Sequence, residues 1–185
     1  PGGKTTHLAE QMNNEGAIVA CDVDGDRLTT VSELARRLGI TIIETRCLAS
    51  DPASGARPAS GGRKSPGESA CDPPDGPFDA ILVDVPCSNT GVLGRRPEVR
   101  WRLKPADFKH LVPLQTKLLI QAGERIRPGG AIVYSTCSIE PDENRHVVEN
   151  VLRALPDLER DADEEQVPGK SADGGYWAKL RRKSL

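Results

Sequence analysis

The chain has 185 residues, a length usual for one domain, and its hydrophobic fraction of 37% together with 18 glycines excludes wholesale disorder. The formal net charge of −2 gives no global attraction to nucleic acid, so nucleic-acid binding would need a local basic surface. No apolar run reaches the roughly 18 residues of a membrane-spanning helix, and the N-terminus has no signal-peptide pattern. We therefore expect a cytoplasmic protein without a membrane partner.

Apolar strands alternate with amphipathic helices along the chain. A short apolar run at 17–21 is followed by helical periodicity over 28–38, which Gly39 ends. Such alternation, with strands apolar on both faces, predicts an α/β fold in which helices cover a mostly parallel sheet. The predicted strands are 17–21, 40–45, 78–84, 131–136 and 176–180, and the predicted helices are 28–38, 114–126 and one that begins near Pro141.

Two stretches lack this periodicity. Residues 50–77 contain 6 Pro, 5 Gly and 5 Ser, a composition typical of a flexible insertion or loop. Residues 157–166 form an acidic run, from which we expect a solvated surface loop.

The cysteines are widely spaced and include no Cys-x-x-Cys pair; they are Cys21, Cys47, Cys71, Cys87 and Cys137. Zinc sites and disulfide frameworks need clustered or evenly paired ligands, so this spacing favours reduced thiols and no metal site. Cys87 and Cys137 each follow a predicted strand, so both thiols should face one crevice at the carboxyl ends of the strands. Cys137 also precedes a predicted helix, whose dipole favours a reactive thiolate.

Pro1-Gly2-Gly3-Lys4 is a glycine turn that opens a helix, where backbone amides can approach a ligand closely. With Asp84 at the end of the run 81–84, this turn fits a phosphate loop and its magnesium-positioning aspartate. With Asp22 at the end of the next strand, it fits an adenosine-containing cofactor whose ribose hydroxyls bind the carboxylate. A plain helix start beside a surface aspartate is the third interpretation.

Two basic clusters are candidate contacts for a polyanion. The first, residues 95–104, has five basic side chains against one acid, with a tryptophan between the arginines; its candidate RNA-binding residues are Arg95, Arg96, Arg100, Trp101, Arg102 and Lys104. This composition suits phosphate contacts plus one stacking surface for an unpaired base, and a solvated loop is the alternative. The second cluster, Lys179, Arg181, Arg182 and Lys183, is more typical of a charged tail.

Taken in order, five segments of the chain resemble the successive motifs of the Sun (Fmu) group of RNA 5-methylcytosine methyltransferases. They are PGGKTTHLAE, VACDVDGDRL, FDAILVDVPCSNTGVLGRRPEVRW, YSTCSIEPDEN and DGGYWAKLRR, which together span nearly the whole chain. Within the group, the resemblance is closest to the small-subunit ribosomal RNA enzymes. It implies a class I, Rossmann-like methyltransferase fold that uses S-adenosylmethionine. It further implies that residues 1–185 are a C-terminal catalytic domain whose first strand is missing, and that this chain alone would bind the cofactor weakly.

The resemblance also assigns roles to matching residues. Cys137 would be the nucleophile, Cys87 would help to release the product, and Asp84 would face both the cofactor and the target base. The implied cofactor contacts are Pro1, Gly2, Gly3, Lys4, Asp22 and Asp84. Asn89 departs from the small Gly or Ala that the group commonly has at its position, and neither Glu44 nor Asp51 is a clear match for the acidic residue expected near the adenine.

Two thiols suit methylation at carbon 5 of cytosine. This carbon is a poor nucleophile, and addition of a thiolate to carbon 6 turns the ring into an enamine-like species that can attack a methyl group. DNA cytosine methyltransferases also have a Pro-Cys pair but lack the Ser-Thr-Cys segment, so we expect an RNA substrate, most of all ribosomal RNA, and no DNA partner. We also expect the protein to be a monomer. The alternatives are a tRNA enzyme, a P-loop nucleotidase and a non-catalytic RNA-binding relative.

Overall fold

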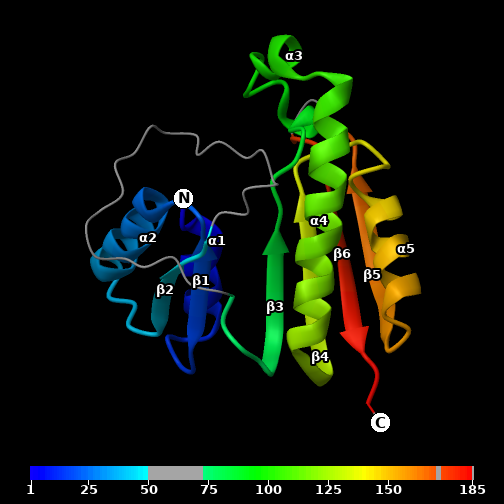
Figure 1. Ribbon diagram of the computed structural model, residues 1–185. Coiled ribbons are helices and arrows are strands. Elements are labelled where there is room, and N and C mark those ends of the chain that lie inside the picture. Colours follow the sequence, from blue (N-terminus) through cyan, green and yellow to red (C-terminus); the bar gives the residue numbers. More distant parts are fainter. Residues whose placement is uncertain (50–72, 170–171, 185) are drawn as a thin grey trace. The chain divides into compact units, whose positions relative to one another are not determined.

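The computed structural model describes residues 1–49, 73–169 and 172–184 (Figure 1). The chain divides into two compact units, unit 1 of residues 1–74 and unit 2 of residues 75–185. Most of the predicted flexible insertion, residues 50–72, lies outside the described residues, whereas 73–77 have no regular structure. Within the part of the chain that the structure describes, no helix is long and apolar enough to cross a membrane.

The described residues of unit 1 form two parallel strands and two helices. Helix α1 (Gly3–Gln11) is followed by β1 (Ile18–Asp22), α2 (Gly25–Arg37) and β2 (Ile43–Cys47). The predicted strand at 17–21 and the helix over 28–38 are confirmed, and the second strand begins three residues later than expected. Asp24 begins α2 by accepting backbone hydrogen bonds from Asp26 and Arg27, as an N-cap does.

Unit 2 is built on a four-stranded sheet. Its strands are β3 (Phe78–Asp84), β4 (Ile126–Thr136), β5 (Leu158–Gln166) and β6 (Gly175–Arg182), in the order β3-β4-β6-β5. Strand β3 pairs with β4 in parallel, whereas β6 runs antiparallel to both β4 and β5. The sheet is therefore mixed, and the prediction of a mostly parallel sheet holds only for β1–β2 and β3–β4.

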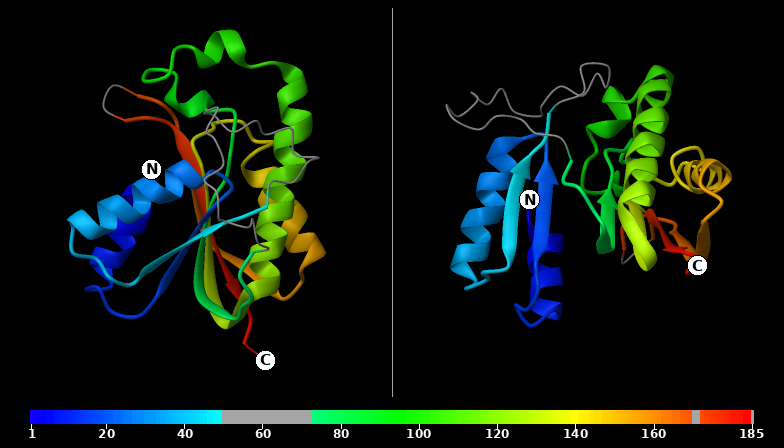
Figure 2. Two further views of the ribbon diagram at one scale, coloured as in Figure 1. Left: turned by 60° about the vertical axis from the view of Figure 1, so that its left-hand side comes forward. Right: turned by 60° about the horizontal axis from the view of Figure 1, so that its bottom comes forward.

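Helices cover one face of this sheet. Helix α4 (Pro105–Arg125) contacts β3 and β4, and α5 (Arg145–Ala154) contacts α4 and β5. Both helices stay on the same side of the sheet in all three views (Figures 1 and 2). The sheet residues and helix residues that they bury form the core of unit 2, which includes Leu119, Ile126, Ile132, Tyr134, Val147, Val148, Val151, Leu158, Tyr176, Ala178 and Leu180.

Both helices differ from their predicted starts. Helix α4 begins at Pro105, nine residues before the expected 114, and continues through Pro113. Proline is favoured in a first helical turn, and Asp107 accepts from the Lys104 backbone N–H at 2.8 Å, which fixes this start. Helix α5 begins at Arg145, because residues 141–144 form a turn whose side chains are used elsewhere.

The acidic run 157–166 is strand β5, and the prediction of a loop there is wrong. Its carboxylates lie beside the basic residues of β6, which makes a favourable cross-strand pairing. Asp161 binds Arg181 at 2.9 Å, and Arg182 binds Asp157 at 2.7 Å. The hydrogen bond from Arg181 lowers the pKa of Asp161 below its ordinary value. Charge complementarity thus stabilises an edge strand that has little apolar pattern of its own.

Candidate active site

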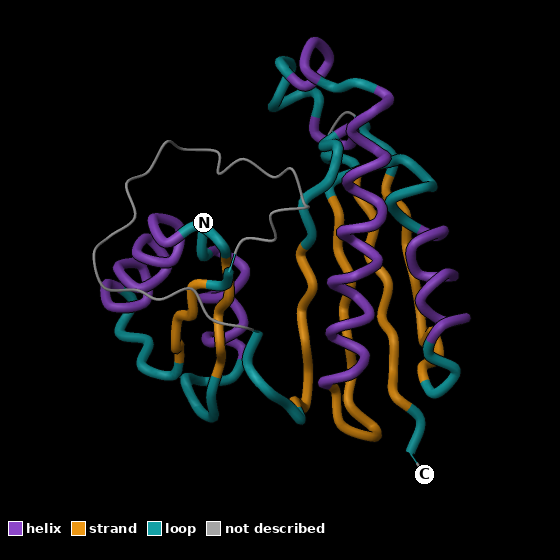
Figure 3. The backbone as a smooth tube through the Cα atoms, viewed as in Figure 1, coloured by secondary structure: helices purple, strands orange, loops and turns teal. Residues whose placement is uncertain are grey.

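The segments that carry both candidate cysteines leave the sheet at the same edge. Strands β3 and β4 are parallel neighbours, with Asp84 opposite Ser135 in the register. Their carboxyl ends therefore meet, and the loops that follow them lie beside each other (Figure 3). Residues 85–92 come after β3 and end in a short 3-10 turn, Thr90–Val92, while residues 137–144 come after β4.

Cys87 and Cys137, which the sequence places at one crevice, are in direct contact at this edge. Their Sγ atoms lie 3.1 Å apart, farther than the about 2.05 Å of a disulfide bond, and both side chains are half-buried. The hydrogen bond with Cys137, together with burial, raises the pKa of the Cys87 thiol far above its ordinary value. Cys87 therefore keeps its proton at neutral pH.

Asn89 connects the two cysteine segments. Its Nδ2 donates to the Cys87 carbonyl oxygen at 2.9 Å, and its Oδ1 accepts from Cys137 Sγ at 3.0 Å. Gly91 brings the segments together at the backbone, where its N–H donates to the Cys137 carbonyl at 3.0 Å. A Cβ at Gly91 would collide with the backbone of Gly174 and Cys137, so only glycine fits this approach.

A buried polar cluster lies behind the thiols; its members are Ser88, Thr90, Gln115, Ser138 and Glu143. Glu143 accepts from the Ser88 N–H and from Gln115 Nε2, each at 2.9 Å, and also from the Ser88 hydroxyl. The Ser138 hydroxyl lies 3.1 Å from that of Ser88 and 3.2 Å from that of Thr90. A carboxylate with no exposed surface is thus satisfied by neutral donors that come from two separate segments.

Sequence reasoning missed the role of Glu143. Its place after Pro141 indicated the first turn of a helix, where a carboxylate stabilises the dipole, yet it precedes α5. The turn that holds it is fixed from β4: Tyr134 Oη donates to the Glu143 carbonyl at 2.6 Å, and Thr136 Oγ1 donates to Asn144 Oδ1 at 2.7 Å. No local pattern indicates such contacts, because they depend on which strand lies beneath the turn.

The basic segment, defined as residues 95–104, belongs to the same unit as the thiols. It contains α3 (Val99–Arg102), which lies beyond the carboxyl ends of β3 and β4 (Figure 1). Buried Val99 anchors the segment, whereas the Trp101 side chain is 87% exposed. Among the described residues, only Arg95 of its five cations forms an ion pair, with Asp173 at 2.9 Å.

The second basic cluster is arranged differently. Besides the pairs of Arg181 and Arg182, Lys179 lies 3.6 Å from Asp161, and Lys183 donates to the Pro156 carbonyl. These side chains therefore neutralise strand β5 and the residue before it. The acidic strand leaves this cluster poorly suited to bind a polyanion.

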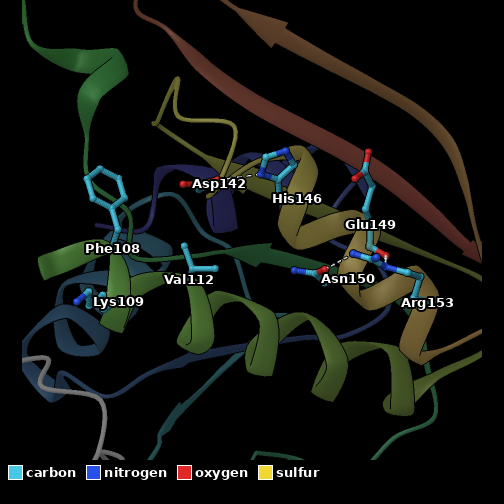
Figure 4. Close-up of a pocket in the computed structure, with 8 residues that line it drawn as sticks. All are labelled: Phe108, Lys109, Val112, Asp142, His146, Glu149, Asn150 and Arg153. Carbon is cyan, nitrogen blue, oxygen red and sulfur yellow. Dashed lines mark hydrogen bonds and ion pairs between the residues drawn. The ribbon is translucent and has the colours of Figure 1, made fainter. Parts of the chain in front are cut away.

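An open groove of about 470 Å³ lies between α4 and α5 (Figure 4). Its walls mix apolar side chains with charges of both signs, including the His146–Asp142 pair at 2.8 Å. None of the predicted site residues lines it. Within the described ranges, no group of three or more His, Cys, Asp or Glu side chains is placed to hold a metal ion.

Comparison with known proteins decides the family. Residues 1–180 match the family described as 16S rRNA methyltransferase RsmB/F. The chain belongs to the RsmB/F family. It is 34% identical over 191 residues to the ribosomal RNA small subunit methyltransferase B of Salmonella paratyphi B, an alignment that covers 99% of this chain and 40% of that protein. The chain thus spans about two fifths of the length of the curated relatives it matches.

Two solved structures have a similar fold to this RsmB/F chain. The protein PH0851 superposes with a TM-score of 0.81 at 32% identity, over 98% of this chain and 40% of that one. NSun6 from Pyrococcus horikoshii, solved with the S-adenosylmethionine analogue SFG, superposes with a TM-score of 0.78 at 26% identity, over 100% of this chain and 46% of that one. The predicted Rossmann-like methyltransferase fold is confirmed.

The other predicted site residues of this RsmB/F chain lie at strand and helix ends. Asp84 is exposed at the end of β3, three residues before Cys87. In unit 1, Gly2 has a φ of 89° at the start of α1, a conformation that favours glycine. Asp22 ends β1, where its Oδ1 accepts from the Asp24 N–H at 3.0 Å. Pro1, Gly3 and Lys4 flank Gly2 and are exposed; Glu44 lies within β2, beside Arg46, and Asp51 lies outside the described residues.

Proposed function

We propose that the protein containing this chain methylates carbon 5 of a cytosine in ribosomal RNA through a covalent adduct with Cys137. The observation that carries the proposal is the 3.1 Å contact between Cys137 and Cys87 at the exits of adjacent parallel strands, in a chain of the RsmB/F family. One sulfur can attack the base while the other stays within reach of the same atoms. Ribosomal RNA is the substrate class that the names of the family and of the Salmonella relative favour.

Cys137 supplies the covalent step. Its thiolate adds to carbon 6 of the cytosine, which forms the S–C bond and moves electron density onto carbon 5. Asp84, at the same edge of the sheet, is the candidate group to stabilise charge that develops at the ring nitrogen and exocyclic amine. The cytosine must be unstacked to reach such an edge, which favours a loop or a remodelled helix of the RNA.

Cys87 supplies the release step. After methylation, the thiolate of Cys87 takes the proton from carbon 5, the double bond between carbons 5 and 6 re-forms, and Cys137 leaves as a thiolate. Cys87 is then a thiol again, its pKa raised by the hydrogen bond with Cys137, and the Cys137 thiolate takes a proton from solvent before the next RNA enters. While Cys137 is bonded to carbon 6, its sulfur is a weaker acceptor, so Cys87 loses its own proton to solvent more readily and becomes the thiolate that acts as the base.

The residues of unit 1 fit S-adenosylmethionine, which would supply an electrophilic methyl group on a sulfonium. The turn at Gly2, whose φ of 89° favours glycine, places backbone amides at the start of α1, where an anion or polar group can bind. Asp22 places a carboxylate at the end of the next strand, as expected of a group that binds ribose hydroxyls. Pro1, Gly3 and Lys4 would complete the methionine end of this site.

The basic segment is the candidate RNA contact. Arg96, Arg100 and Arg102 form no ion pair with another described residue, so their charge is available to phosphates. Exposed Trp101 between them offers a stacking surface for an unpaired base. Arg95 and Lys104 complete the set.

Trapping with 5-fluorocytidine tests the proposal. Fluorine at carbon 5 cannot leave as a proton does, so the full-length protein, incubated with S-adenosylmethionine and ribosomal RNA that contains 5-fluorocytidine, should form a stable adduct on Cys137. Cys137→Ala should form none, and Cys21→Ala, which changes an exposed cysteine of β1, should react normally. An adduct that persists in Cys137→Ala would overturn the assignment. Mapping of 5-methylcytosine in ribosomal and transfer RNA with and without the gene separates the two RNA classes.

A further inference from the structure

Asn89 contacts Cys87 and Cys137 through its amide group. The Nδ2–H···O=C bond to Cys87 and the Sγ–H···Oδ1 bond from Cys137 are 2.9 and 3.0 Å long. Its backbone is left-handed, with φ 63° and ψ 23°, a conformation that asparagine tolerates better than most residues. The amide is therefore held at both its nitrogen and its oxygen.

These two contacts determine which end of the amide faces the nucleophile. A half-turn of the amide would point Oδ1 at the Cys87 carbonyl oxygen and set two acceptors against each other. Oδ1 therefore faces the Cys137 sulfur, and this oxygen has no proton to give. A thiol can donate to it, whereas a thiolate cannot, so the contact favours the protonated form of Cys137.

We propose that Asn89 is a positioning residue that holds Cys137 as a thiol, aimed at the amide oxygen, until RNA enters the site. The inference rests on the proposed function only in taking Cys137 as the nucleophile. Thiolate formation requires one of two movements. Either the Cys137 side chain turns away from Oδ1, or the amide turns and donates Nδ2–H to the sulfur while it loses the Cys87 carbonyl bond.

Other titratable groups around the pair stay the same when Asn89 is replaced. Glu143 is occupied by Ser88 and Gln115, and burial raises the pKa of Tyr134, which keeps it neutral. The titratable groups on the neighbouring segments are Asp84 at the end of β3, Tyr134 on β4, Glu143 before α5 and Asp173 before β6, the last paired with Arg95. Two substitutions at position 89, one that removes the acceptor and one that gives it a negative charge, therefore isolate the effect of the amide oxygen on Cys137.

Alkylation by iodoacetamide measures this effect without RNA or cofactor. The full-length protein is titrated across about pH 6 to 10, and peptide mass spectrometry separates Cys137 from the other cysteines. Asn89→Gly keeps the left-handed backbone and removes the acceptor, so Cys137 should react about three- to tenfold faster at neutral pH, with its apparent pKa lowered. Asn89→Asp places a negative acceptor beside the sulfur, so the reaction should slow by a similar factor and the apparent pKa should rise.

Asn13 provides the matched control, since it is an exposed asparagine with a left-handed φ of 54° outside the site. Asn13→Gly and Asn13→Asp should leave the Cys137 rate unchanged. Equal rates in both Asn89 variants, or shifts in the same direction, would overturn the proposal. If Asn89→Gly unfolds, all cysteines will react faster together, and the slower reaction of Asn89→Asp then decides the question. Because no RNA is used, a failure here is distinct from a failure to trap RNA.

Discussion

The polar cluster behind the thiols and the basic segment above them are both rich in hydrophilic residues, yet they are built in opposite ways. Glu143 and Ser88 are buried and have several hydrogen-bond partners each, whereas Trp101 and its neighbouring arginines project from a four-residue helix anchored by Val99. The first region can fix atoms to within a fraction of an ångström, and the second can adapt to a partner. We therefore expect the cluster to govern the rate of the chemical steps and the segment to govern RNA affinity.

The two basic clusters of the chain differ in how their cations are paired. The basic residues of β6 are as dense as those of the basic segment, but acidic partners on and beside β5 already neutralise them. Local density of positive charge is therefore a poor guide to a polyanion site unless the pairing of each cation is known. The following predictions test whether chemistry and affinity divide between the two regions, and all apply to the full-length protein.

The largest effect is expected from Cys137→Ala. Removal of the nucleophile should lower kcat by about 10⁴-fold or more, with no change in the Kd for RNA, because the basic segment is intact. Single-turnover methyl transfer and filter binding measure the two quantities. The division would fail if RNA binding were lost together with activity.

Cys87→Ala should block turnover after methylation. Without the base that removes the carbon 5 proton, steady-state kcat should fall by about 10²- to 10⁴-fold, while the protein remains covalently joined to natural RNA. Denaturing gels reveal this adduct without fluorinated RNA, and Cys21→Ala is the control. An inactive Cys87→Ala without any adduct would contradict the release role.

Trp101→Ala should weaken RNA binding and leave the chemical step intact. Loss of one base–aromatic stack costs about 1–3 kcal/mol, which corresponds to a rise of about 5- to 150-fold in Kd. Trp177→Ala, which removes the partly exposed tryptophan of β6, should leave Kd unchanged. A fall in single-turnover kcat at saturating RNA would show that the segment also shapes the thiol site.

Glu143→Gln should slow the chemical step and leave RNA binding nearly unchanged, the reverse of Trp101→Ala. The new NH₂ group would face the donors of Ser88 or Gln115, so one buried hydrogen bond is lost at a cost of about 1–3 kcal/mol in the free energy of unfolding. We expect kcat to fall about tenfold with little change in Kd, as the Cys87 segment loses its anchor. Urea denaturation and single-turnover kinetics measure these effects. Glu149→Gln, on the exposed face of α5, is the control.

The smallest effect is expected in the salt dependence of binding. Arg100→Ala should lower the slope of log Kd against log salt concentration by about 0.7, the value for one phosphate contact on a single strand. Arg181→Ala should leave the slope unchanged, since Arg181 is already paired with Asp161 at 2.9 Å. Equal effects of the two substitutions would remove the distinction between the basic clusters.

The sequence by itself determined the features that depend on near neighbours. Strand β3 was predicted residue for residue, because an apolar run bounded by turn residues is a local signal. Placement of Cys87 and Cys137 after parallel neighbouring strands followed from strand order, and the family followed from motif order. These signals were enough to indicate a methyltransferase and the two thiols.

Only the tertiary structure decided which groups meet across long separations. The Cys87–Cys137 contact joins residues 50 positions apart, and the Ser88–Glu143 bond joins residues 55 apart. The tertiary structure also decides the form of β5, because its acidic residues form a strand by pairing with β6, which lies beside them in the fold. Burial and charge pairing depend on the residues that surround a side chain in the fold. In the sequence, Glu143 therefore indicates only the start of a helix, whereas in the fold its carboxylate binds Ser88, the residue next to Cys87.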